Sequence, residues 1–218
     1  MIPPARRPYG NGPDQYADLY GADPSTLVLH GGFWRARYTA EIMDGFCADL
    51  AERGVATWNA EYRRVGVGGG YPETLDDVAA ACRELRPRFA VGHSAGGHLA
   101  LWAAAEGLVE GAVSLGGVCD LVAGAADRLG NGAVFEFLGA PPSAHPDADP
   151  AARLPLRARV LLIHGSEDDT VPVEHARSFS ERAGCKLLEL DGGGHLDVIE
   201  PDGPFWPDVA DALVAFVG

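Results

Sequence analysis

RFAVGHSAGGHLALWAAA, residues 88–105, is the stretch that decides the fold. An apolar run leads into Gly-His-Ser-Ala-Gly at 92–96, and a run rich in alanine and leucine follows. A serine on a sharp turn between a strand and a helix lifts its hydroxyl above the sheet, and small neighbours let the strained turn pack closely. The helix start behind it favours negative charge. The pattern therefore predicts a strand at Phe89–His93, a nucleophilic Ser94 and a helix at Ala95–Ala105.

The same alternation of short apolar runs and helical patterns continues along the chain. We expect further strands at Gln15–Tyr20, Thr26–His30, Val55–Glu61, Gly111–Gly116, Val160–His164 and Lys186–Leu190. We expect further helices at Ala40–Arg53, Thr74–Leu85, Val173–Ala183 and Trp206–Val217. This alternation predicts an α/β fold whose mostly parallel central sheet has about seven strands, with helices on both faces. In such sheets ligands bind beyond the carboxyl ends of the strands.

Three details of these elements can be checked in a structure. Ile42, Phe46 and Leu50 recur at four-residue spacing and predict the buried face of the helix at Ala40–Arg53, which Gly54 would end. Thr74 is expected to cap the start of the next helix. The longest interruption, 120–158, holds one helical candidate at Gly132–Leu138 and then a proline-rich run. It is either a minimal cap over a site or a surface excursion.

Composition narrows the class of protein. The 218 residues, 47% of them hydrophobic, suit one globular domain over 1–218. A net charge of −14 argues against a nucleic acid or an anionic membrane as partner, and a single lysine excludes a P-loop. The start has no signal-peptide pattern and no apolar run is long enough to span a membrane, so we expect a cytoplasmic protein. The four cysteines form no C-x-x-C pair, and no zinc or other metal is expected.

A nucleophilic serine needs a base, and the base needs an acid to orient it. The acid candidate is Asp168 in HGSEDDTVP, residues 164–172, with Glu167 and Asp169 as close rivals. The base candidate is His195 in the glycine-rich LDGGGHLDVIEP, residues 190–201. The order serine, acid, histidine is that of one class of serine hydrolase.

The other six histidines have structural interpretations. His30 and His164 end strands and would brace loop backbones. The remaining four are His93 as the variable letter of the motif, His98 packed beneath the serine turn, and His145 and His175 as exposed side chains.

Four segments together resemble the α/β-hydrolase fold. They are HGGFW at 30–34, GHSAGG at 92–97, HGSEDDTVP at 164–172 and GHLDVIEP at 194–201. More narrowly, they resemble its esterase/lipase branch and the kynurenine formamidases, and the similarity covers nearly the whole chain. The resemblance implies a single α/β-hydrolase domain with a minimal cap and no cofactor. It also implies a serine hydrolase, of carboxylesterase or arylformamidase type, that cleaves a small carboxylic ester or an N-formyl aromatic amide.

The resemblance also implies a role for each residue. Ser94 would attack the carbonyl carbon, His195 would take its proton, and Asp168 would fix the imidazole. Backbone N–H groups would hold the developing oxyanion. They belong to Gly32, Phe33 and Ala95, and the substrate-binding candidates are Phe33, Trp34 and Tyr62.

Three alternatives stay open at this point. Phe33 and Trp34 either wall a substrate or pack in the core. The protein is either an enzyme or a ligand-binding protein on a hydrolase fold that has lost catalysis. A serine peptidase is a third option. We expect a small-molecule partner and leave a homodimer open.

Overall fold

The computed structural model describes residues 4–218. In this part of the chain eight strands form one sheet in the order β1-β2-β4-β3-β5-β6-β7-β8. Six of them, from β4 to β8 in that order, run parallel, while β2 pairs antiparallel with both β1 and β4. The strands are β1 (Ala5–Pro8), β2 (Tyr16–Tyr20), β3 (Thr26–Leu29), β4 (Thr57–Ala60), β5 (Phe89–His93), β6 (Gly111–Leu115), β7 (Arg159–Gly165) and β8 (Lys186–Leu190).

The expected sheet of about seven strands therefore has one more, β1 at its edge. All four of its residues are exposed, so the sequence Ala-Arg-Arg-Pro shows no apolar alternation. Pairing with β2 forms the strand, and Arg6 donates two hydrogen bonds to Asp18 of β2, at 2.8 and 2.7 Å. Cross-strand charge of this kind leaves no signal in hydrophobic periodicity.

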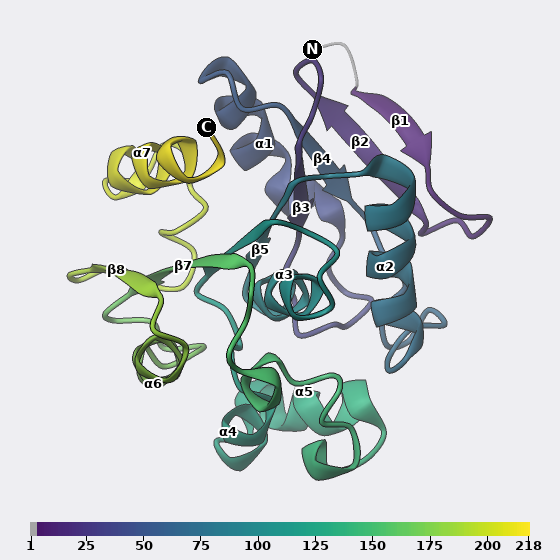
Figure 1. The fold of residues 1–218 in the computed structure, drawn as a ribbon, viewed down its shortest axis with the longest axis vertical. Coiled ribbons are helices and arrows are strands. Elements are labelled where there is room, and N and C mark those ends of the chain that lie inside the picture. Colours follow the sequence, from purple (N-terminus) through teal and green to yellow (C-terminus); the bar gives the residue numbers. More distant parts are fainter. Residues whose placement is uncertain (1–3) are drawn as a thin grey trace.

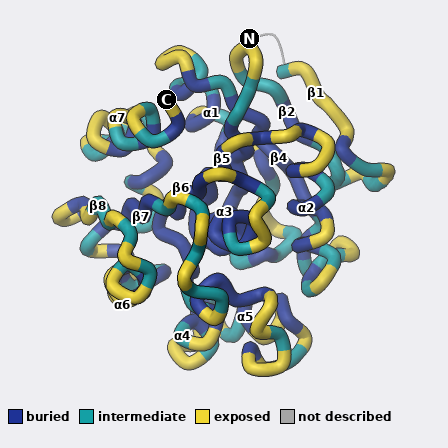
Figure 2. Tube along the Cα trace, in the orientation of Figure 1, coloured by how far each residue is buried: buried dark blue, intermediate teal, exposed yellow. Residues whose placement is uncertain are grey.

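Successive side chains of the central strands enter two separate cores. Leu27 and Leu29 of β3 pack in one core, and Val28 packs in the other. In β5, Ala90 faces the first core, and Phe89 and Val91 face the second. A strand buried on both faces has a continuous apolar run, which is why β3 and β5 are recognisable in the sequence. Figure 2 shows buried backbone at the centre of the molecule, where these strands lie.

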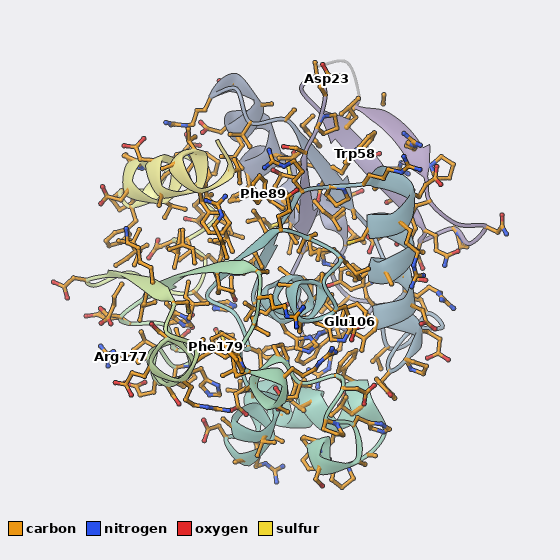
Figure 3. The ribbon with its side chains drawn as sticks, viewed as in Figure 1. Asp23, Trp58, Phe89, Glu106, Arg177 and Phe179 are labelled. Carbon is orange, nitrogen blue, oxygen red and sulfur yellow. The ribbon has the colours of Figure 1, made fainter. Side chains whose placement is uncertain are left out.

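Helices cover both faces of the sheet (Figure 1). The first core receives α2, α3 and α6, and the second receives α1 and α7. These five helices are α1 (Asp44–Glu52), α2 (Glu73–Leu85), α3 (Ala95–Ala105), α6 (Glu174–Ala183) and α7 (Trp206–Val217). Figure 3 shows the two sides of α6, where Phe179 points toward the sheet and Arg177 points away from it to solvent.

Residues 120–158 form a small lobe at one end of the molecule (Figure 1). It holds α4 (Leu121–Ala126), α5 (Leu129–Leu138), and the single turns η2 (Pro142–Ala144) and η3 (Pro150–Arg153). The sequence predicted only the second part of α5. The first part is hidden because Gly130, Asn131 and Gly132 all have positive φ and kink the helix. Asp120 caps α4 by accepting from Ala123 N at 2.9 Å.

Two predicted helix details were wrong. Ile42 lies in the short turn η1 (Ala40–Met43), before α1, and is 40% exposed instead of facing the core. Thr74 lies inside α2, whose N-cap position is Pro72; its hydroxyl accepts from Gly70 N and donates to Arg63 O, so it ties the preceding loop. Gly54, by contrast, ends α1 at φ +87° as predicted.

Within residues 4–218, none of the helices has the length and apolar character needed to cross a bilayer.

Candidate active site

Ser94 lies on a strained turn between β5 and α3. Its φ is +56°, a value that a residue with a side chain adopts at a cost of about 1–3 kcal/mol. Close backbone approach holds the turn. A Cβ atom on Gly92 would collide with Gly96 O, and one on Gly96 would collide with Leu29 O in β3. The two flanking glycines therefore let the turn lie directly against the neighbouring strand.

Asp168 and His195 meet beyond the ends of β7 and β8. His195 Nδ1 lies 2.7 Å from Asp168 Oδ2. The other carboxylate oxygen, Oδ1, accepts from Thr170 N at 2.9 Å and from Val171 N at 2.8 Å. Backbone N–H groups of its own loop therefore hold the carboxylate in place, in addition to its contact with the imidazole. The rival acids Glu167 and Asp169 are exposed, and it is Asp168 that contacts His195.

His164 is a second imidazole on this carboxylate. Its Nε2 lies 2.8 Å from Val171 O and 3.2 Å from Asp168 Oδ2, so the ring braces the loop as the sequence indicated and also approaches the acid. Burial raises the pKa of Asp168, but hydrogen bonds from His164 and His195 outweigh it and bring the pKa well below its ordinary value. Asp168 therefore stays ionised at neutral pH.

His93 contacts the backbone of the loop that carries His195. Its Nε2–H donates to His195 O at 3.0 Å, and the two rings lie 4.6 Å apart between centroids. Burial, together with the nearby His195, lowers the pKa of His93 to about 3, so the ring is neutral. In the sequence this residue is only the variable letter of the motif. No local signal shows the contact, because it joins residues 102 positions apart.

The HGG loop follows β3, which is the neighbour of β5, and so lies beside Ser94. A Cβ atom on Gly31 would be 2.9 Å from Ser94 Cβ, a distance that only glycine permits. Gly32 and Phe33 have φ values of +107° and +53°. Among the backbone hydrogen bonds of loops and helix caps within residues 4–218, none has the N–H group of Gly32, Phe33 or Ala95 as its donor.

A buried carboxylate–histidine pair supports this loop. His30 Nδ1 donates to Gly31 O at 2.7 Å, and its Nε2 lies 2.9 Å from Glu61 Oε1. Both ring nitrogens therefore face oxygen atoms of the protein. Tyr62 stacks on the ring at 4.4 Å and donates to His30 O at 2.7 Å. The sequence predicted His30 as a loop brace, but it indicated no partner for it.

A cavity of about 400 Å³ joins these parts. Its walls include Ser94 and His195 together with apolar side chains. The lining residues are Gly32, Phe33, Tyr38, Ile42, His93, Ser94, Asp169, Thr170, His195 and Leu196. Tyr38, Ile42 and Leu196 were not predicted as wall residues, although each lies in or within eight residues of a motif that the sequence makes recognisable.

Two of the three expected substrate-binding residues do not reach the cavity. Trp34 is fully buried, and its ring stacks on Phe137 of α5 at 4.7 Å between centroids. Of the two alternatives for Trp34, it therefore packs in the core. Tyr62 is buried against His30. Phe33 does line the cavity, and its ring packs so closely on Gly130 that a Cβ there would be 2.8 Å away.

The remaining histidines lie outside the cavity. His98 is buried and its Nε2 donates to Ala148 O at 2.8 Å, as its packed position predicted. His175 was expected to be exposed, but it is buried and contacts Asp127 at 3.0 Å. Within residues 4–218 no group of three or more His, Cys, Asp or Glu side chains is placed to hold a metal ion.

Known proteins share this architecture. The chain is 27% identical to Esterase LipC of Mycobacterium tuberculosis over 96% of its own length, and it spans 63% of that relative. An esterase of Thermogutta terrifontis, solved with propionate bound, superposes with a TM-score of 0.80 at 22% identity, over 99% of this chain and 93% of that one. An acetyl ester-xyloside bifunctional hydrolase from Caldicellulosiruptor lactoaceticus gives 0.79 at 19% identity, over 100% and 99%. These similarities support the α/β-hydrolase fold.

A family model covers the centre of the chain. The model of the prolyl oligopeptidase family, Peptidase_S9, matches residues 53–184, which is more than half of the sequence. The matched range includes the serine turn and Asp168. The chain therefore belongs to the prolyl oligopeptidase family.

Proposed function

We propose that the protein is a serine hydrolase that cleaves small carboxylic esters through an acyl-enzyme. Ser94 is the nucleophile, His195 the general base and Asp168 the acid that orients the imidazole. The observation that carries the proposal is the 2.7 Å contact between Asp168 and His195 at a cavity that also holds Ser94 on its strained turn. With Nδ1 held by the carboxylate, Nε2 is the nitrogen that accepts the serine proton.

The reaction proceeds in two displacements. Ser94 Oγ bonds to the carbonyl carbon while its proton passes to His195 Nε2. The bond to the leaving oxygen then breaks, and that oxygen takes the proton from the imidazolium. Water repeats both steps on the acyl-enzyme and releases the acid. Negative charge develops on the carbonyl oxygen, and the N–H groups of Gly32, Phe33 and Ala95 are the donors proposed for it, each worth about 3 kcal/mol.

Names of similar proteins support an ester as the substrate. The relative from Mycobacterium tuberculosis is called an esterase, and Thermogutta terrifontis esterase 2 was solved in a form phosphorylated by paraoxon. The same chemistry applied to an N-formyl aromatic amide would release an aromatic amine and formate. The rings of Phe33 and Tyr38 at the cavity wall support such a group, so this formamidase activity is our second candidate.

A direct test uses wild type, Ser94→Ala, His195→Ala and, as a matched control, His145→Ala, whose histidine does not line the cavity. The substrates are p-nitrophenyl acetate, p-nitrophenyl butyrate, N-formylkynurenine and a prolyl-peptide p-nitroanilide. We expect ester hydrolysis to fall to background in the first two variants and to persist in the control. Peptide mass spectrometry after treatment with a fluorophosphonate would locate the adduct on Ser94.

Three outcomes would change the assignment. Near-wild-type turnover in Ser94→Ala or His195→Ala would contradict the mechanism. A strong preference for N-formylkynurenine or for the prolyl peptide would replace the ester with a formamidase or a peptidase. No turnover of any substrate, together with no fluorophosphonate adduct, would favour a ligand-binding protein.

A further inference from the structure

The cavity that holds Ser94 adjoins a second groove. This groove has a volume of about 740 Å³ and shares Tyr38, Ile42 and Leu196 with the first cavity. Its other walls come from α1, the end of the His195 loop and the turn before α7. They are Gly45, Phe46, Ile199, Glu200, Pro201, Asp202, Gly203 and Pro204. The two hollows therefore adjoin at these three side chains, along a path that leads away from the serine.

The shared wall is apolar and exposed. Six large hydrophobic side chains of the described chain are exposed, and three of them are Tyr38, Ile42 and Leu196, at 38, 40 and 54%. The other three line neither hollow. Scattered exposed hydrophobic residues need no explanation, but a cluster that continues a candidate active site is typical of a ligand-binding surface.

The charged residues that line the path are acidic, while Arg37, outside the lining, lies 5.4 Å from the centre of the Tyr38 ring. Asp169 lies at the first cavity, and Glu200 and Asp202 line the groove beyond the apolar wall. Neither set of lining residues includes a lysine or an arginine. A ligand that reaches the far end therefore meets carboxylates, which repel an anion and attract a cation.

Building on the proposed function, we propose that the substrate is an ester with an extended apolar arm. The arm lies across Tyr38, Ile42 and Leu196, and its far end beside Glu200 and Asp202 is uncharged or cationic. The groove would bind the same apolar arm whether that arm belongs to the acyl group or to the alcohol. The experiment below distinguishes the two.

Gly45 offers a way to fill the groove without disturbing the serine. It lies exposed in the first turn of α1, and its φ is not in the left-handed region. A Cβ there would meet only Pro201 Cγ, at 4.0 Å, which is ordinary contact. Gly45→Phe should therefore fold and place a ring in the groove, and Gly45→Ala is the matched control that leaves the groove open.

The assay compares two series of esters below their critical micelle concentrations. One series is p-nitrophenyl esters from acetate to decanoate, and the other is acetates of alkanols from ethanol to decanol. In the wild type and Gly45→Ala we expect kcat/KM to rise about tenfold for every two methylenes that leave water. In Gly45→Phe we expect kcat/KM for the longest esters to be at least tenfold lower than in wild type. We expect p-nitrophenyl acetate to be hydrolysed at the wild-type rate.

The outcomes separate this inference from the proposed function. Loss of chain-length preference in the first series assigns the arm to the acyl group, and loss in the second series assigns it to the alcohol. If p-nitrophenyl acetate is hydrolysed but both series are flat, or are unchanged by Gly45→Phe, the inference is overturned and the proposed function stands. If no ester is hydrolysed and Ser94 takes no fluorophosphonate, the proposed function fails, and this inference fails with it.

Charge is tested with two esters of equal length, one ending in a carboxylate and one in a trimethylammonium group. We expect wild type to prefer the cationic ester by about fivefold, as expected for two carboxylates near the surface. Glu200→Gln combined with Asp202→Asn should remove that preference and leave p-nitrophenyl acetate turnover unchanged. An equal or greater rate with the anionic ester in wild type would refute the charge assignment.

Discussion

Replacing Glu61 with glutamine tests whether the buried pair beneath the HGG loop stabilises the fold and the site together. The carboxylate is almost completely buried. Its Oε1 is approached by His30 Nε2 at 2.9 Å, Tyr62 N at 3.0 Å and Arg64 Nη1 at 3.3 Å. Its Oε2 accepts from Ala40 N at 3.0 Å. Burial raises the pKa of Glu61, but the hydrogen bond and charge of His30 with the two backbone donors outweigh it and lower the pKa below its ordinary value.

The size of the effect follows from these contacts. In Glu61→Gln, an amide oxygen at the position of Oε1 leaves the amide NH₂ group facing the N–H of Ala40, donor against donor. An unsatisfied buried donor costs about 1–3 kcal/mol. Loss of the negative charge weakens the hydrogen bond from His30 and the ion pair with Arg64 by about 1 kcal/mol each. Glu61→Gln should therefore destabilise the protein by about 3–5 kcal/mol, the range found when one partner of a buried ion pair is removed.

The measurement is urea unfolding followed by tryptophan fluorescence at pH 7. With a dependence on urea of about 2–3 kcal/mol per molar, the midpoint should fall by about 1–2.5 M. Glu84→Gln is the matched control, because its pair with Arg7 is half exposed on both sides, and we expect no measurable shift. Esterase kcat should also fall in Glu61→Gln below the unfolding transition, since His30, which donates to Gly31 O, loses its carboxylate partner. A midpoint equal to that of Glu84→Gln would refute the reasoning.

Three further predictions concern the site. The folded-state pKa of Asp168 is lowered from its ordinary value, so the unfolded chain binds this proton more readily in acid. The stability that Asp168 contributes is therefore present above about pH 4 and is lost as the pH falls below it. Urea midpoints across about pH 3–7 would measure this loss. Gly96→Ala should strongly lower the melting temperature, because its Cβ would collide with Leu29 O, whereas Gly45→Ala should not; calorimetry compares the two. His93→Gln, which can still donate to His195 O, should keep most of kcat for p-nitrophenyl acetate. His93→Leu cannot donate, and its kcat should fall about tenfold or more with little change in KM. Equal rates in the two variants would exclude a positioning role for His93.

The sequence predicted the limits of strands and helices best where local pattern and tertiary structure agree. The strand Phe89–His93 and the helix Ala95–Ala105 were predicted with their observed limits, because the apolar run, the glycines and the serine turn all indicate the same local structure. The strand β1 was missed because backbone pairing and the Arg6–Asp18 ion pair form it without an apolar face. Periodicity detects burial, and this strand has none.

Neighbouring residues of one motif show where sequence reasoning ends. Phe33 lines the cavity, and Trp34 is buried against Phe137. Both residues have positive φ, at +53° and +57°. A side-chain pattern does not encode two successive left-handed residues outside glycine, so only the structure identifies the substrate wall. The same holds for Ile42, which fits a helical repeat but lies in a turn before α1.

Two of the carboxylate–histidine pairs described above differ in what the second ring nitrogen contacts. In the Glu61–His30 pair, both nitrogens of the imidazole are hydrogen-bonded to acceptors and both side chains are sealed from solvent. In the Asp168–His195 pair, the carboxylate is sealed but the histidine side chain is 12% exposed and lines the cavity. A general base must release and recover a proton in each cycle, so it needs one nitrogen that the protein does not occupy. The first pair is therefore suited to hold the loop in one position, and the second is suited to move a proton, although both use the same two functional groups.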